Sequence, residues 1–380
     1  MNVILGVIFH FIGGFASGSF YIPFKKVKGW HWESYWIIGG LFSWLIVPPL
    51  AAWLTIPDFW TIIGQTDGST LALTFVFGLL WGVGGCTYGL GVRYLGVALG
   101  SSIILGLCMV FGSLIPSIYY DFNPQPGKDR FSEMISSNWG LVVLAGLVIC
   151  VLAIVICGRA GMMKEKQLSQ LDASDPHGIK VRTEYKFGLG LLVSIISGVL
   201  SACFNFGLEA GKPMSDIANA AWKAAHPGEG EFLYRNNVIY VVLLWGGLST
   251  NLVWTMILNA RNKTFGDYVN RKTPLKWNYL FSALAGTTWF LQFFFYGMGE
   301  SKLGNGASSW ILHMAFIILV ANMWGIVLGE WKAVSKTTKT TIVAGIVTII
   351  VSVLLVGKGN QLHDEKNKQQ AAQTAILNNQ

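Results

Sequence analysis

The chain has 380 residues, of which 53% are apolar and only 12% are charged, and its mean hydropathy is +0.51. A composition this apolar excludes a soluble globular protein, a disordered chain and a collagen-like one. The five cysteines lie in apolar runs without a Cys-x-x-Cys pair, so neither a disulfide scaffold nor a metal site is expected. The composition therefore predicts an all-α integral membrane protein.

Ten uncharged runs are long enough to cross the hydrocarbon core as helices, which takes about 20 residues. In chain order they cover residues 3–22, 36–56, 71–91, 96–120, 138–157, 187–208, 236–258, 278–299, 307–329 and 340–356. The first basic residue, Lys25, follows the first run, and no small-residue cleavage pattern comes after it. We therefore expect a retained first helix in place of a secretory signal.

The connections between these spans differ in charge. Those that follow odd-numbered spans hold 18 of the 27 Lys and Arg residues. The positive-inside rule then predicts that these loops face the cytoplasm and that both termini face outward, including a polar tail that we expect to be disordered. Because the basic residues are scattered through short loops, the net charge of +8 indicates topology, and no nucleic acid is expected as a partner.

The third and eighth spans share a sequence pattern. Trp81-x6-Tyr88-Gly89-x-Gly91 recurs 208 positions later as Trp289-x6-Tyr296-Gly297-x-Gly299. Shorter matches link the other spans of the two halves, which predicts a first five-helix repeat (1–160), a cytoplasmic linker (161–186), a second repeat (187–358) and a tail (359–380). Five is odd, so the two repeats are inverted, an arrangement that places a binding site near the midplane and supports alternating access. Chance likeness between glycine-rich helices is the alternative.

Polar side chains inside apolar spans are candidates for a ligand site. Trp289, Gln292 and Tyr296 share one face of the predicted eighth helix, and aromatic rings beside amides suit a sugar. The predicted substrate-binding residues are Trp289, Gln292, Tyr296, Asn205, Tyr88 and Trp310. For Gln292 and Asn205 the alternative is a hydrogen bond between helices.

Three titratable residues are candidates for proton coupling. His10 and His313 lie at a similar depth from the outer ends of their helices, and Glu209 follows the sixth span. Histidine changes charge near neutral pH, so a proton is the expected coupling ion, with no cofactor and no metal. The alternative for each histidine is a neutral ring hydrogen-bonded inside the bundle. Glu300, at the end of a span, is expected at the membrane interface.

Several strings resemble the L-rhamnose/proton symporters of the drug/metabolite transporter superfamily, over nearly the whole chain. They are the segments 20–28 (FYIPFKKVK), 93–96 (RYLG), 212–214 (KPM), 291–296 (LQFFFY) and 310–314 (WILHM). The resemblance implies a ten-helix permease of the bacterial inner membrane. Such a permease imports L-rhamnose, or a closely related deoxy sugar, with a proton by alternating access.

Three other functions compete with a proton-coupled importer, and one of them, a channel, would need pore-lining rings from a symmetric oligomer, which one chain cannot reveal. An exporter or exchanger of another small metabolite with the same ten-helix fold is the main alternative. An enzyme would need a nucleophile with its base, a metal-ligand cluster or paired carboxylates within the spans, and the sequence shows no such set there. The predicted partners are the sugar and the membrane lipid, and the sequence carries no indication of an oligomeric state.

Overall fold

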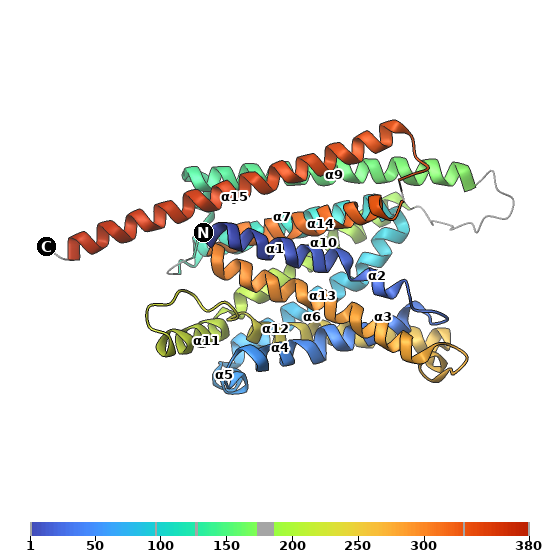
Figure 1. Cartoon of the computed structure of the whole chain (residues 1–380), viewed down its shortest axis with the longest axis horizontal. Coiled ribbons are helices and arrows are strands. Elements are labelled where there is room, and N and C mark those ends of the chain that lie inside the picture. The colour runs from blue at the N-terminus through green and yellow to red at the C-terminus, as the bar shows by residue number, and fades with distance from the viewer. Residues whose placement is uncertain (1, 96, 126–127, 173–185, 330, 379–380) are drawn as a thin grey trace.

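A computed structural model describes residues 2–95, 97–125, 128–172, 186–329 and 331–378, and in this part the regular structure is entirely helical (Figure 1). The long helices are α1 (Asn2–Ser19), α6 (Gly68–Leu95), α7 (Val97–Phe122), α9 (Asn138–Asp172), α10 (Phe187–Ala210), α12 (Asn237–Asn262), α13 (Leu275–Leu303), α14 (Gly306–Val327) and α15 (Lys336–Asn378). The shorter ones are α2 (Tyr21–Phe24), α3 (Trp32–Gly40), α4 (Val47–Thr55), α5 (Phe59–Gln65), α8 (Phe131–Ser136) and α11 (Lys212–Ala225), with η1 (Leu41–Ile46) and η2 (Phe265–Val269).

Within these residues, nine helical segments are long and apolar enough to cross a membrane, and each covers one of the predicted spans. The predicted eighth span, 278–299, is helical as well, as part of α13, but α13 is not among the nine. It carries polar residues such as Asn278, Gln292 and Glu300, and all three are buried against the rest of the bundle. Because these polar side chains face other helices, a helix of this composition can lie among apolar ones.

The second span is built from three pieces: α3, the π-helical η1 and α4. Pro48 and Pro49 stand in the first turn of α4 and have no backbone N–H to donate. The regular α-helical ladder is interrupted just before them, and the chain passes through a wider turn. The change from α-helix to π-helix and back therefore falls just before the two prolines.

Helices from distant parts of the chain cross at glycines with their backbones in contact. A methyl group added to Gly286 on α13 would collide with the carbonyl oxygen of Gly39 on α3. A methyl group added to Gly78 on α6 would collide with the carbonyl oxygen of Leu243 on α12, next to Gly246. Small residues are what allow helices to approach this closely.

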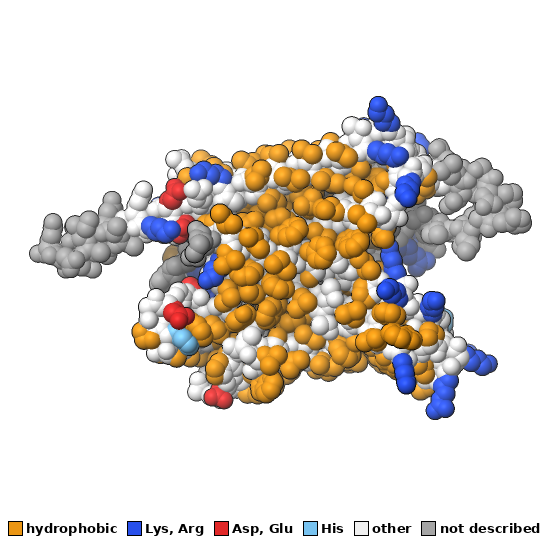
Figure 2. All heavy atoms as spheres, viewed as in Figure 1, with side chains coloured by type: hydrophobic (Ala, Val, Ile, Leu, Met, Phe, Trp, Pro, Cys, Tyr) orange, Lys and Arg blue, Asp and Glu red, His pale blue; other side chains and the backbone are white. Residues whose placement is uncertain are grey.

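The two ends of the molecule differ in charge. On the face in Figure 2, hydrophobic side chains cover the middle, most Lys and Arg lie at one end, and the acidic side chains lie at the other. Helix α1 begins and α15 ends at the acidic end (Figure 1). On this face the apolar band thus lies between a basic end and the end that carries both termini.

The expectation of a disordered tail is wrong for the described residues, because α15 continues as a helix to Asn378 and projects beyond the bundle (Figure 1). An ion pair one turn apart supports this extension, between Lys368 and Asp364 at 2.6 Å. The predicted linker 161–186 is helical as far as Asp172, within α9, and residues 173–185 lie outside the described part.

Candidate functional site

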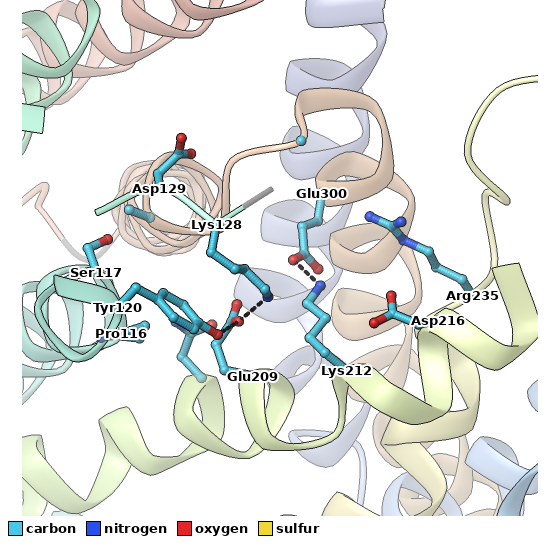
Figure 3. Close-up of a pocket in the computed structure, with 14 residues that line it drawn as sticks. Pro116, Ser117, Tyr120, Lys128, Asp129, Glu209, Lys212, Asp216, Arg235 and Glu300 are labelled. Atoms are coloured by element: carbon cyan, nitrogen blue, oxygen red, sulfur yellow. Dashed lines mark hydrogen bonds and ion pairs between the residues drawn. The ribbon is translucent and has the colours of Figure 1, made fainter. Parts of the chain in front are cut away.

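A polar cavity of about 200 Å³ opens at the end of the bundle where α1 begins (Figure 3). The ends of α7, α10 and α13 and the starts of α11 and α14 surround it. Its charged lining residues are Lys128, Asp129, Glu209, Lys212, Asp216, Arg235 and Glu300. This many charges around one small space in an apolar bundle make the cavity the candidate binding site.

Glu209, at the end of α10, holds one ion pair on the cavity wall. The Lys128 Nζ lies 2.6 Å from the Glu209 Oε2, and the Tyr120 hydroxyl donates to the same oxygen at 2.7 Å (Figure 3). The Lys128 ammonium also lies over the Tyr120 ring, 5.2 Å from its centroid. This predicted coupling residue is therefore ionically paired and faces the cavity.

A second ion pair joins Lys212, at the start of α11, to Glu300 near the end of α13. Their Nζ and Oε1 atoms are 2.5 Å apart, and the Asn236 side-chain amide donates to the other carboxylate oxygen at 2.5 Å. The sequence suggested a place at the membrane interface for Glu300; the structure shows that its carboxylate is buried, lines the cavity and is paired with Lys212. Removing one partner of such a pair leaves a buried charge without its counterion.

Asn205 lies deeper in the cavity wall, about one helical turn before Glu209. Its Nδ2 donates to the Gly112 carbonyl oxygen at 2.6 Å, and its Oδ1 accepts a long hydrogen bond from the Tyr296 hydroxyl at 3.4 Å. Tyr296 is buried and does not line the cavity. Asn205 therefore touches both the cavity and the protein interior behind it.

Behind Tyr296 lie the two predicted histidines. His10 and His313 are buried, and their rings lie 5.3 and 5.1 Å from the Tyr296 ring and 6.2 Å from each other, between centroids. None of their four ring nitrogens has a hydrogen-bond partner among the described residues. Gly299 leaves the room for His10, since a methyl group there would lie 2.7 Å from the His10 Nε2. Buried polar groups are usually paired, so an unpaired histidine couple calls for an explanation.

The other predicted sugar contacts lie apart from the cavity lining. Gln292 is buried and donates to the carbonyl oxygen of Trp289 on its own helix at 3.0 Å. Trp289 packs with Trp44 and Trp81, with ring centroids 5.8 and 5.6 Å away. Trp44 and Trp289, but not Trp81, line a second hollow of about 10 Å³, which is room for roughly one water molecule. The site role of Gln292 and Trp289 remains a prediction.

Trp310 and Tyr88 are the remaining predicted contacts. The Trp310 indole donates to the Cys108 carbonyl oxygen at 3.1 Å and lies beside Tyr296, with ring centroids 5.9 Å apart. Tyr88 donates to the Ser101 hydroxyl at 2.7 Å. Neither lines the cavity, so the structure groups Trp310 with the histidines and leaves Tyr88 separate.

The opposite, basic end carries a hydrogen-bond network, named here the basic-end latch, made of His31, Glu33, Ser34, Asn262, Thr264 and Asp267. The backbone N–H of His31 and the Ser34 hydroxyl both donate to the Asp267 carboxylate at 2.8 Å, and the His31 ring lies 3.0 Å from it. Glu33 accepts from Asn262 and Thr264, both at 2.9 Å. Partial burial by itself raises the pKa of Asp267, but the hydrogen bonds from His31 and Ser34 together outweigh it and lower this pKa.

Sequence reasoning missed Lys128, Lys212 and Glu300 as members of the site. Lys128 and Lys212 lie outside the apolar runs, and Glu300 was assigned to the membrane surface. One signal was available: Glu300 follows Tyr296 by four residues and therefore shares its helical face. Its counterion, Lys212, is far away in sequence and gave no local sign.

A bundle of membrane-crossing helices around a charged cavity, with unpaired histidines behind that cavity, defines a multi-pass membrane transporter. The profile of the L-rhamnose-proton symport protein family matches residues 1–361 of this chain. The L-rhamnose-proton symporter of Pectobacterium atrosepticum is 35% identical over 362 residues, which cover 94% of this chain and 98% of the relative. The symporter of Yersinia pestis strain Pestoides F shows the same identity and coverage.

The chain therefore belongs to the L-rhamnose-proton symporter family. Membership confirms the resemblance seen in the sequence, and it confirms the expectation of a transporter in place of an enzyme.

Proposed function

We propose that this protein imports L-rhamnose, or a closely related deoxy sugar, together with a proton by alternating access. The observation that carries the proposal is the polar cavity with Asn205 in its wall. Its volume of about 200 Å³ lies below the roughly 300–1,000 Å³ of sites for drug-sized ligands, so it suits a monosaccharide. Its carboxylates, amide and ammonium groups supply the donors and acceptors that sugar hydroxyls need.

The proposed architecture is ten membrane helices in two inverted five-helix repeats, with α13 as the helix that completes the ten. Reciprocal packing supports it: α1 packs on α13 and α14, while α10 packs on α6 and α7. The glycine crossings are reciprocal too, since Gly39 meets Gly286 and Gly246 meets Gly78, which are the same places in the two repeats. A pseudo-twofold relation in the membrane plane produces such matched contacts.

The proposed orientation puts the basic end in the cytoplasm of a bacterial cell and both termini outside the inner membrane. The gathering of Lys and Arg at one end supports it (Figure 2). The cavity would then open outward while the basic-end latch closes the inner side. Single cysteines in place of Lys26 and Lys368 test this orientation with an impermeant thiol reagent on intact spheroplasts, which must label only the position at Lys368.

The coupling proton is proposed to bind at Glu209 or at the pair of His10 and His313. Glu209 faces the cavity and can meet water there, whereas the histidines are reached through Asn205 and Tyr296. A symporter requires that the sugar and the proton favour each other's binding, which is a coupling free energy between two sites.

Uptake of labelled L-rhamnose into proteoliposomes tests the function. An inward proton gradient should drive accumulation above the external concentration, and a protonophore should reduce it to equilibration. Uptake that ignores the protonophore, or no uptake of L-rhamnose by protein that remains folded, would contradict the proposal. Vesicles without protein serve as the control.

A further inference from the structure

Tyr296 lies between the sugar cavity and the two histidines. Its hydroxyl donates to the Oδ1 of Asn205, a cavity residue, and its ring meets the edges of both imidazoles. The side chain is 1% exposed and is not part of the cavity lining. A ligand in the cavity therefore meets Asn205 first, and Tyr296 stands behind it.

The chemistry of the three groups allows one continuous chain of hydrogen bonds. A protonated histidine carries two N–H donors and no acceptor, and a phenol oxygen can accept one of them while its own O–H donates onward. Neither histidine has a partner among the described residues, so a new proton on either ring creates a demand for an acceptor. The Tyr296 ring lies against both imidazoles, 5.3 and 5.1 Å away between centroids, so its oxygen is the acceptor we assign to this new N–H, while its own O–H stays bonded to Asn205.

Asn205 connects this chain of hydrogen bonds to sugar binding. Its amide nitrogen has two hydrogens, and one is already donated to the Gly112 carbonyl oxygen. When Tyr296 holds the Oδ1, the amide plane is fixed at both ends and its second N–H stays available for a sugar hydroxyl. A charged imidazolium strengthens the hydrogen bonds in series with it, so protonation favours the binding-ready amide.

We infer that Tyr296 is a positioning residue that links protonation of the His10–His313 pair to sugar binding at Asn205, and that it does not contact the sugar itself. The inference rests on the proposed function and deepens it. His10 on α1 and His313 on α14 face Tyr296 across the helix interface. The other ionisable groups in electrostatic reach are Glu300 on α13, Glu209 on α10 and Tyr240 on α12, and the two carboxylates are ion-paired with lysines.

The test is the pH dependence of L-rhamnose binding to the purified full-length protein, measured by titration calorimetry in wild type and Tyr296→Phe. In buffers of different ionisation enthalpy, the same titration also counts the protons taken up per sugar bound. In the wild type, coupling to one proton raises the Kd by up to about tenfold per pH unit above the pKa of the coupling group. In Tyr296→Phe we expect a Kd that changes less than about twofold over the same range, with proton uptake near zero.

Tyr240→Phe is the matched control, because it also removes a buried phenol oxygen from this core. In the described part of the chain, the ring contacts of Tyr240 are with Phe290 and Phe293, and not with the histidines. This variant must keep the wild-type pH slope, that is, the wild-type change of the Kd for L-rhamnose with pH. A Tyr296→Phe protein that binds more weakly by one constant factor at every pH, with the slope retained, would show a sugar contact and overturn the inference. A variant identical to the wild type overturns it as well.

Asn205→Ala breaks the same chain from the cavity side and covers the case in which Tyr296→Phe does not fold. It should weaken binding and also flatten the pH slope, and a retained slope would contradict the link. Failure of the proposed function looks different, because then the wild-type protein itself does not bind L-rhamnose at any pH. Wild-type binding without pH dependence contradicts the link.

Discussion

Lys212→Met is the sharpest test of the charged cavity wall. The side chains of Lys212 and Glu300 are 12% and 6% exposed, so the substitution leaves a carboxylate that is nearly out of water with Asn236 as its remaining partner. Breaking a buried ion pair from one side costs about 3–5 kcal/mol. Water in the adjoining cavity screens the charge in part, so we expect Lys212→Met to lower the free energy of unfolding by about 3 kcal/mol.

The pair of Lys128 and Glu209 provides the comparison within the same cavity. Its side chains are 23% and 15% exposed, which places it between a buried and a surface pair. Lys128→Met should therefore cost less, about 1–2 kcal/mol. Thermal unfolding in detergent should rank the midpoints as wild type, then Lys128→Met, then Lys212→Met.

A double variant separates lost charge from lost packing. Lys212→Met combined with Glu300→Gln removes both charges and should recover most of the stability that Lys212→Met loses. If the free energy of unfolding of Lys212→Met lies within about 0.5 kcal/mol of the wild-type value, the ion pair is hydrated and contributes little to stability. That result would refute the reasoning from burial.

Three further outcomes are expected. Gln292→Leu should weaken L-rhamnose binding by about 1–3 kcal/mol, or roughly 5- to 150-fold, if Gln292 contacts the sugar, and equilibrium binding at wild-type affinity would leave it a purely structural residue. Among His10→Gln, His313→Gln and Glu209→Gln, at least one should abolish accumulation under an imposed pH gradient but keep exchange of labelled for unlabelled sugar, and normal accumulation in all three would locate the proton elsewhere. Asp267→Asn should lower the midpoint of thermal unfolding at neutral pH. Folding lowers the pKa of Asp267, so the ionised carboxylate stabilises the fold above about pH 4, and this stabilisation is lost as the pH falls through the folded-state pKa. The difference in midpoint between the variant and the wild type should therefore disappear in acid.

The helices were predictable because a helix that crosses the membrane needs an apolar run as long as the hydrocarbon core is thick. The apolar run that predicted α1 did so without any tertiary information, and the same holds for α7 and α14. The tail after residue 358 was not recognised as helix, because its polarity suggested disorder while its Ala, Gln, Lys and Glu content also suits an exposed helix. Polarity alone does not distinguish these two states.

The site was only partly predictable. Asn205 and Glu209 stand out in the sequence because they are polar groups within or directly after an apolar run, and both line the cavity. His10 and His313 stand out for the same reason, and their role stays a prediction. Lys128 and Lys212 were missed because they belong to segments between runs, where charge is ordinary. Their importance arises when the chain after α7 and the start of α11 meet over one cavity, and that meeting depends on tertiary packing.

The glycine crossings bear on how the helices would move against one another in the proposed alternating access. Where Gly39 touches Gly286 and Gly78 touches the chain beside Gly246, two backbones are in contact without side chains to separate them. Helices that rock against each other about such points swing widely at their ends and hardly shift at the crossing. In the proposed alternating access the crossings would act as pivots, so we expect a chemical cross-link there to leave transport possible and the same cross-link across the basic-end latch to block it.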